Sequence, residues 1–115
     1  MNNTFTINNV NWKIRFVDKN SDVLYRPDGS LTLGVTDRTS KTVYISNRLN
    51  GALLKKVVTH EICHCCIFSY GIYLTLEQEE YLCDFVAKYA DEIVNLANDS
   101  STKNAFSVQK NRVMI

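Results

Sequence analysis

No part of the chain combines the length and the apolar character that a membrane-spanning helix needs. The first ten residues, MNNTFTINNV, contain neither the basic segment nor the apolar segment of a signal peptide. Neither sign of charge predominates, because the chain has 13 Lys and Arg and 12 Asp and Glu, which gives a net charge of +1. This balance offers no overall attraction to nucleic acid. We therefore expect a cytoplasmic protein that binds neither membranes nor nucleic acids.

Disulfide bonds are not expected either, although the chain has four cysteines. Three of them fall within one helical turn of the segment described next, where neighbouring residues rarely have disulfide geometry. We interpret all four as reduced thiols that pack as small apolar residues: Cys63, Cys65, Cys66 and Cys83. The alternative at Cys63 is a thiolate ligand to zinc, since this residue borders the histidines of the motif below.

The segment VVTHEICHCCIF, residues 57–68, contains His60, Glu61 and His64 in the order H-E-x-x-H. Residues four apart lie on one face of an α-helix, so both imidazoles point the same way and can bind one Zn²⁺. Glu61 projects beside that face, where its carboxylate can take a proton from a metal-activated water. This combination is typical of the active-site helix of zinc peptidases. The alternative is a pair of core histidines that hydrogen-bond to other groups.

The chain has only two histidines, and both belong to this motif. A catalytic zinc site has three protein ligands and one open position, so the third must be a carboxylate or, less favoured, a cysteine. An acidic cluster follows in the next predicted helix, and there we assign Glu80 as the ligand, with Glu79 as runner-up. Asp84 shares the helix face of Glu80 and is expected to accept the second N–H of a ligating histidine. A solvated acidic first turn would also explain the cluster.

Alternating apolar and polar side chains predict a strand over residues 11–18. Two more strands are predicted over residues 31–36 and 41–46, joined as an antiparallel hairpin. Residues 1–9 are either frayed or a short edge strand. Residues 23–25 are either a short strand or one helical turn, and the sequence alone leaves both choices open.

Two helices complete the pattern. One is predicted over residues 51–70, carries the motif and is apolar on every side, which indicates burial. The other is predicted over residues 76–98 and opens with a capping box in which Thr75 is the N-cap and Gln78 the N3 residue. Apolar residues recur along it at helical spacing, and we expect them to pack on the core: Leu82, Phe85, Val86, Tyr89, Ile93 and Leu96.

These elements predict an α+β fold, with a small antiparallel or mixed β-sheet packed on two main helices. At 115 residues the chain is long enough for one core. We assign a single domain to residues 1–98 and a loosely ordered tail to residues 99–115. Gly34 interrupts a predicted strand and marks a bulge, a close approach of another backbone or a position beside a loop.

The order His60-Glu61-x-x-His64 followed by Glu80-x-x-x-Asp84 resembles the gluzincins, zinc peptidases whose third ligand is a glutamate. The layout of the hairpin GVTDRTSKTVYI and then the metal helix is similar to that of small HExxH proteins of bacteria and their phages, grouped near the ImmA/IrrE-like metallopeptidases. The resemblance covers roughly residues 31–93. The usual Gly-type residue before the second histidine is Cys63 here.

The resemblance implies a minimal zincin-like core with one Zn²⁺ per chain. Its ligands would be His60, His64 and Glu80, with Glu61 as the general base and Asp84 supporting a histidine. The resemblance also implies a peptide or protein substrate that adds to the sheet as a β-strand near three residues: Leu33, Gly34 and Val35. The protein would then work in the cytoplasm of a bacterial or phage-infected cell.

The function predicted on this basis is hydrolysis of peptide bonds by a metal-activated water, with Glu61 as the base. A second group besides zinc must stabilise the oxyanion, and the candidates by residue type are Arg38, Tyr44, Tyr70 and Tyr73. One rival is a non-catalytic zinc-containing binding or regulatory module of phage or mobile-element origin, whose site would be closed by a fourth ligand such as Cys63 or Cys83. Another is a hydrolase of non-peptide amides. The oligomeric state stays open.

Overall fold

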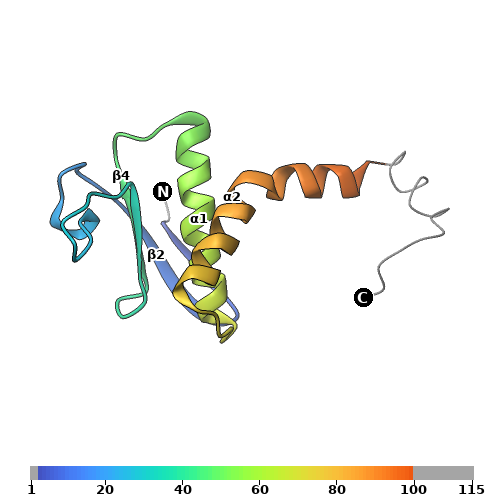
Figure 1. Cartoon of the computed structure of the whole chain (residues 1–115), viewed down its shortest axis with the longest axis horizontal. Helices are drawn as coiled ribbons and strands as arrows, with labels where there is room; N and C mark the ends of the chain where they lie inside the picture. The colour runs from blue at the N-terminus through green and yellow to red at the C-terminus, as the bar shows by residue number, and fades with distance from the viewer. Residues whose placement is uncertain (1–2, 100–115) are drawn as a thin grey trace.

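The computed structural model describes residues 3–99 and has an α+β fold, as the sequence predicts (Figure 1). A four-stranded mixed sheet, a single turn of 3₁₀ helix and two long helices follow one another along the chain. Their bounds are β1 Thr4–Ile7, β2 Val10–Val17, η1 Asp22–Leu24, β3 Gly34–Asp37, β4 Thr42–Ser46, α1 Gly51–Ser69 and α2 Leu76–Asn98. The tail predicted over residues 99–115 lies outside the described residues, except for Asp99, which caps α2.

The strands lie in the order β1-β2-β4-β3, so that β1 and β3 form the two edges of the sheet. β1 is the short edge strand that was one alternative for the N-terminal residues. Its turn into β2 is made by Asn8 and Asn9, which both have positive φ and so match the right-handed twist of a tight hairpin. The predicted hairpin of β3 and β4 is confirmed, and β4 lies parallel to β2.

β3 begins three residues later than the sequence pattern predicts. The backbone N–H and the hydroxyl of Thr32 both donate to the carbonyl of Leu24, and Leu31 forms an isolated bridge with Tyr25. Residues 31–33 therefore bond mainly to residues 24–25, at the end of η1, and not only to β4. The same contacts show that residues 22–24 form a helical turn, which decides the alternative left open for this segment.

The core lies between the sheet and α1. Four side chains are fully buried at its centre: Trp12, Val43, Ile45 and Cys65. The indole Nε1 of Trp12 donates to Ser69 Oγ over 2.9 Å, so the most buried polar group of β2 is satisfied at the end of α1. α1 is not buried on every side as predicted, because its first turns face outward and Leu53 is 50% exposed. The helix ends at Ser69 with Tyr70 as its C-cap, and the positive φ of Gly71 fits the left-handed C′ position.

α2 packs mainly on α1, and its C-terminal half projects away from the rest of the molecule (Figure 1). The predicted capping box is present, with Thr75 and Gln78 bonding to each other's backbone N–H groups. The predicted packing of the apolar stripe is wrong, because five of its residues are 38–51% exposed: Leu82, Phe85, Tyr89, Ile93 and Leu96. Helical periodicity identified the apolar face of α2 correctly, but this face is longer than the part of α2 that α1 covers.

All four cysteines are free thiols, as predicted. Cys65 and Cys83 are fully buried, and burial raises the pKa of the Cys65 thiol to about 12. Such a thiol stays protonated and packs as an apolar group. Neither helix of residues 3–99 has the combination of length and hydropathy that crossing a bilayer requires.

Candidate metal centre

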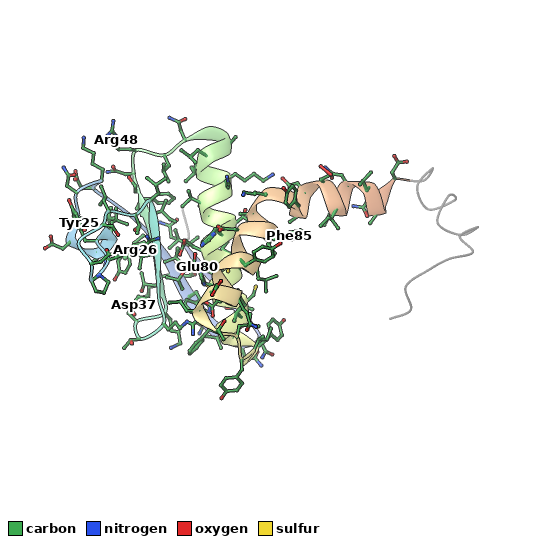
Figure 2. The ribbon with its side chains drawn as sticks, in the orientation of Figure 1. Tyr25, Arg26, Asp37, Arg48, Glu80 and Phe85 are labelled. Carbon is green, nitrogen blue, oxygen red and sulfur yellow. The ribbon has the colours of Figure 1, made fainter. Side chains whose placement is uncertain are left out.

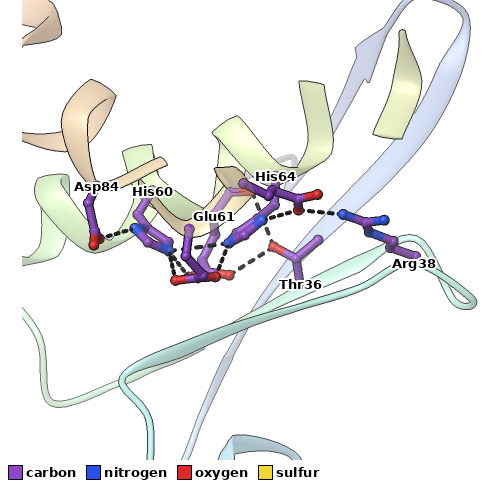
Figure 3. Close-up of polar contacts among 8 residues, drawn as sticks. Thr36, Arg38, His60, Glu61, His64 and Asp84 are labelled. Carbon is purple, nitrogen blue, oxygen red and sulfur yellow. Dashed lines mark hydrogen bonds and ion pairs between the residues drawn. The ribbon is translucent and has the colours of Figure 1, made fainter. Parts of the chain in front are cut away.

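The middle of α1 presents three polar side chains toward β3 and α2, where the layers meet (Figure 3). These are His60, Glu61 and His64, whose side chains are only 18%, 8% and 11% exposed. Two full turns of α1 precede His60, so its position is fixed by regular helix rather than by a loop. The one-turn spacing brings the two rings together, with their centroids 5.0 Å apart.

The Nε2 atoms of His60 and His64 converge on one point, 3.2 Å from each other. Glu80 reaches the same point from α2. Its Oε1 lies 2.9 Å from His64 Nε2, and its Oε2 lies 3.4 Å from His60 Nε2. α2 thus brings the carboxylate assigned from the sequence to the two imidazoles.

The Nδ1 atoms face away from this point, and each has a carboxylate of its own. His60 Nδ1 lies 3.0 Å from Asp84 Oδ1, and His64 Nδ1 lies 2.5 Å from Glu79 Oε2. Since an ionised carboxylate only accepts hydrogen bonds, both Nδ1 atoms carry the proton in this arrangement. Both Nε2 atoms then present lone pairs toward Glu80.

Glu79 is buried and also accepts a hydrogen bond from Arg38. Burial alone would raise the pKa of this carboxyl group, but its hydrogen bonds to Arg38 and His64 outweigh that effect and lower the pKa. Glu79 therefore stays ionised. A row of hydrogen bonds therefore connects Arg38 through Glu79 to His64 (Figure 3).

Glu61 lies on α1 itself, and the strongest contact of its carboxylate is with a hydroxyl group. The hydroxyl of Thr36 on β3 donates to Glu61 Oε1 over 2.9 Å, and Glu61 Oε2 lies 3.9 Å from His60 Nε2. Burial raises the pKa of the Glu61 carboxyl group above its usual range. The free oxygen of this carboxylate therefore lies beside the point on which the Nε2 atoms converge.

These residues line a cavity of about 430 Å³ between β3, α1 and the start of α2. Arg38 lines it as well, whereas Tyr44, Tyr70 and Tyr73, which were the other candidates for oxyanion stabilisation, do not. Tyr73 points into solvent with 98% of its side chain exposed. Of the residues expected to receive substrate, Gly34 and Val35 line this cavity, and Leu33 lines an adjoining one.

The chain matches no protein-family model, no curated protein and no solved structure. The site is therefore interpreted from its own geometry. Tetrahedral zinc with bonds of ~2.0–2.2 Å places its ligand atoms about 3.3 Å apart. The distances of 3.2, 3.4 and 2.9 Å among the three converging groups fit this spacing. The donor set also fits, since imidazole and carboxylate are ordinary zinc ligands.

Cysteine takes no part in this cluster. Within residues 3–99, two groups of ligand-type side chains gather within 4.8 Å, and both consist of His, Glu and Asp: His60, Glu61 and His64, and His60, Glu80 and Asp84. Cys63 instead contacts Cys83 between the two helices. A site closed by a fourth, cysteine ligand has no support in this arrangement.

Sequence reasoning missed two residues of the site. Thr36 was assigned only to a strand, and Glu79 was considered as a ligand instead of as the partner of His64 Nδ1. No sequence signal pointed to Thr36, because its contact with Glu61 joins a strand to a helix 25 residues away. For Glu79 the acidic cluster was a signal, but the rotation of α2 against α1 decides which acid faces which nitrogen.

Proposed function

We propose that this protein is a zinc-dependent peptidase in which His60, His64 and Glu80 bind the metal and Glu61 is the general base. One observation carries the proposal. The two Nε2 atoms and the Glu80 carboxylate converge within 2.9–3.4 Å, while each Nδ1 atom lies beside the carboxylate of another acid. Acceptors this close repel one another unless a cation lies between them. A zinc ion would satisfy all three.

Zinc, when bound, supplies a Lewis acid that polarises a carbonyl group and makes water nucleophilic near neutral pH. Glu61 takes the proton of the attacking water and delivers it to the leaving amine. Thr36 supports this role because its hydroxyl fixes one carboxylate oxygen and leaves the other free. A purely structural metal site has no use for such a base.

Arg38 is the candidate for stabilising the oxyanion, because it lines the cavity and carries a permanent charge. Its guanidinium group has five N–H donors, and only one of its side-chain nitrogens is paired with Glu79. Asp84 and Glu79 hold the two imidazoles in the tautomer that metal binding requires.

The test compares metal content and peptide hydrolysis in wild type, His64→Ala and Glu61→Gln. Wild type should carry one zinc per chain and cleave a random peptide mixture, as followed by mass spectrometry. His64→Ala should lose both properties. Glu61→Gln should keep the zinc and lose hydrolysis by about 100-fold or more, since general-base catalysis contributes that much.

Three outcomes contradict the proposal. Wild type that binds no zinc at neutral pH would leave a pair of hydrogen-bonded histidines. Wild type that binds zinc but cleaves no peptide would point to the non-catalytic zinc module. Hydrolysis that survives Glu61→Gln would show that another group is the base.

A further inference from the structure

A second cavity of about 290 Å³ adjoins the first one, and the two share His60 and Glu61 in their walls. The reacting centre therefore lies where two halves of one cleft meet. The first half continues toward Arg38 and Glu79, and the second half continues toward the N-terminal part of α1. We call this second half the α1 arm.

Four apolar side chains line the α1 arm. Leu33 precedes β3, Leu53 and Val57 come from α1, and Ala87 comes from α2. The side chains of Leu33 and Leu53 are 46% and 50% exposed, although they lie beside buried polar residues of the centre. Exposed apolar surface inside a cleft is a feature of binding sites, since a ligand side chain that covers it gains hydrophobic free energy.

Two cations stand at the rim of the α1 arm. Lys56 belongs to α1. Arg26 comes from the loop before β3 (Figure 2). Among the described residues neither makes an ion pair, in contrast to the neighbouring Lys55, which pairs with Asp91. The one exposed acid in the arm is Asp84, and its carboxylate is already bonded to His60 Nδ1. The rim therefore offers positive charge to a ligand, from Lys56 and from Arg26, although Arg26 also helps to lower the pKa of the nearby Asp28 carboxyl group.

From this arrangement we propose that the α1 arm binds a peptide segment with a large apolar side chain and an acidic side chain within two positions of it. The apolar side chain would cover Leu33, Leu53 and Val57, and the carboxylate would approach Lys56 and Arg26. This inference rests on the proposed function in that it takes the ligand to be a peptide. It adds the class of sequence that the cleft selects.

The experiment measures binding and cleavage separately. Zinc-loaded Glu61→Gln protein is titrated with three fluorescently labelled hexapeptides, AALEEA, AALQQA and AAAEEA, and their affinities are compared by anisotropy. AAAEEA should bind about 10-fold more weakly than AALEEA, because it lacks the apolar side chain. AALQQA should bind about 3- to 5-fold more weakly, and that difference should vanish in high salt.

Lys56→Glu tests the rim, with Lys55→Glu as the matched control. The two residues are adjacent on the same helix, but only Lys56 lines the α1 arm. In the Glu61→Gln background, Lys56→Glu should abolish the preference for AALEEA over AALQQA, and Lys55→Glu should leave it unchanged. Equal effects of the two variants, or equal affinities of the three peptides, would overturn the inference.

Cleavage by the protein with Glu61 intact then separates this inference from the proposed function. Binding preference without any hydrolysis would support the α1 arm as a peptide site and reject the peptidase. Hydrolysis of a peptide mixture without enrichment of apolar and acidic residues near the cleaved bond would support the peptidase and reject the α1 arm.

Discussion

Two adjacent acids, Glu79 and Glu80, approach His64 from different directions. Neighbouring residues on a helix are about 100° apart around its axis, so the two side chains cannot share one partner atom. Glu79 meets Nδ1 and is buried, whereas Glu80 meets Nε2 and is partly exposed. The sequence could predict that an acid from this helix reaches the histidines. It ranked Glu80 above Glu79 as the ligand, but it did not place Glu79 beside His64 Nδ1, because the rotation of α2 depends on packing between segments far apart in the chain.

Replacing Glu79 with Gln should weaken zinc binding by about 10- to 100-fold, the usual cost of losing a partner that orients a ligand. Gln keeps the size of the side chain but leaves Arg38 without its ion pair. Glu80→Gln removes a proposed ligand and should weaken binding further. Glu77→Gln is the control, since Glu77 lies exposed in the same helical turn and lines neither half of the cleft. Competition with a chromophoric chelator measures the zinc affinity of all three variants. If Glu79→Gln loses more zinc affinity than Glu80→Gln, then Glu79 is the ligand and Glu80 is the residue that orients a histidine.

Gly34 is explained by a close approach between β3 and α1. A Cβ built on this residue would lie 2.9 Å from Val57 Cγ1, 3.1 Å from Glu61 Cγ and 3.2 Å from Ile45 Cδ1. Its φ is not positive, so steric room rather than backbone freedom requires glycine here. The sequence raised the close approach of another backbone; the close approach is present, but it is made by side chains of α1 and β4 instead of by a backbone.

Gly34→Ala should therefore destabilise the protein by about 1–3 kcal/mol, the usual cost of overpacking. It should also reduce peptide hydrolysis, because one of the displaced atoms belongs to Glu61. Denaturant unfolding measures the first effect. The double variant Gly34→Ala/Val57→Ala relieves the shortest contact and should recover part of the lost stability relative to Val57→Ala alone. If the free energies of the two substitutions are additive, the added methyl group is accommodated by movement of atoms other than those of Val57.

At the scale of elements, the most reliable predictions were those set by local interactions. The capping box of Thr75 and Gln78 and the hairpin of β3 and β4 depend on hydrogen bonds between residues close in sequence. The parallel pairing of β2 with β4 and the late start of β3 depend on contacts with distant segments, and the sequence did not reveal them. For α2, the amphipathic pattern predicted which face is apolar but not how far α1 extends to cover it.

The matched pair Ile45→Ala and Ile93→Ala tests the placement of α2. Ile45 is fully buried in β4, so its truncation should cost about 2–5 kcal/mol. Ile93 is 51% exposed, and its truncation should cost less than about 1 kcal/mol. Both free energies of unfolding come from denaturant titration. An equal cost at the two positions would mean that the C-terminal half of α2 is covered in solution, for example by a second copy of the chain.

At the scale of the whole molecule, the candidate metal centre joins two layers. His60 and His64 belong to the helix that packs on the sheet, and Glu80 belongs to the outer helix. Further polar links also tie α2 to the rest: Asp84 with His60, Glu79 with His64 and Arg38, and Asp91 with Lys55. The last of these is an exposed ion pair, which contributes little to stability. A bound metal would therefore add to the packing of α2 on α1 an attachment at the centre of their contact.

Removing the metal with a chelator should lower the thermal stability of the wild-type protein. A ligand present at 100 times its Kd stabilises the folded state by about 2.7 kcal/mol. For a domain of this size, that loss corresponds to a fall in Tm on the order of 10 °C. Hydrogen exchange should rise first in the N-terminal half of α2, because this half supplies Glu80, the proposed metal ligand. His64→Ala is the reference, since its Tm should be low and should not change when zinc is added or removed. If the wild-type Tm does not change with zinc either, the metal does not contribute to the attachment of α2.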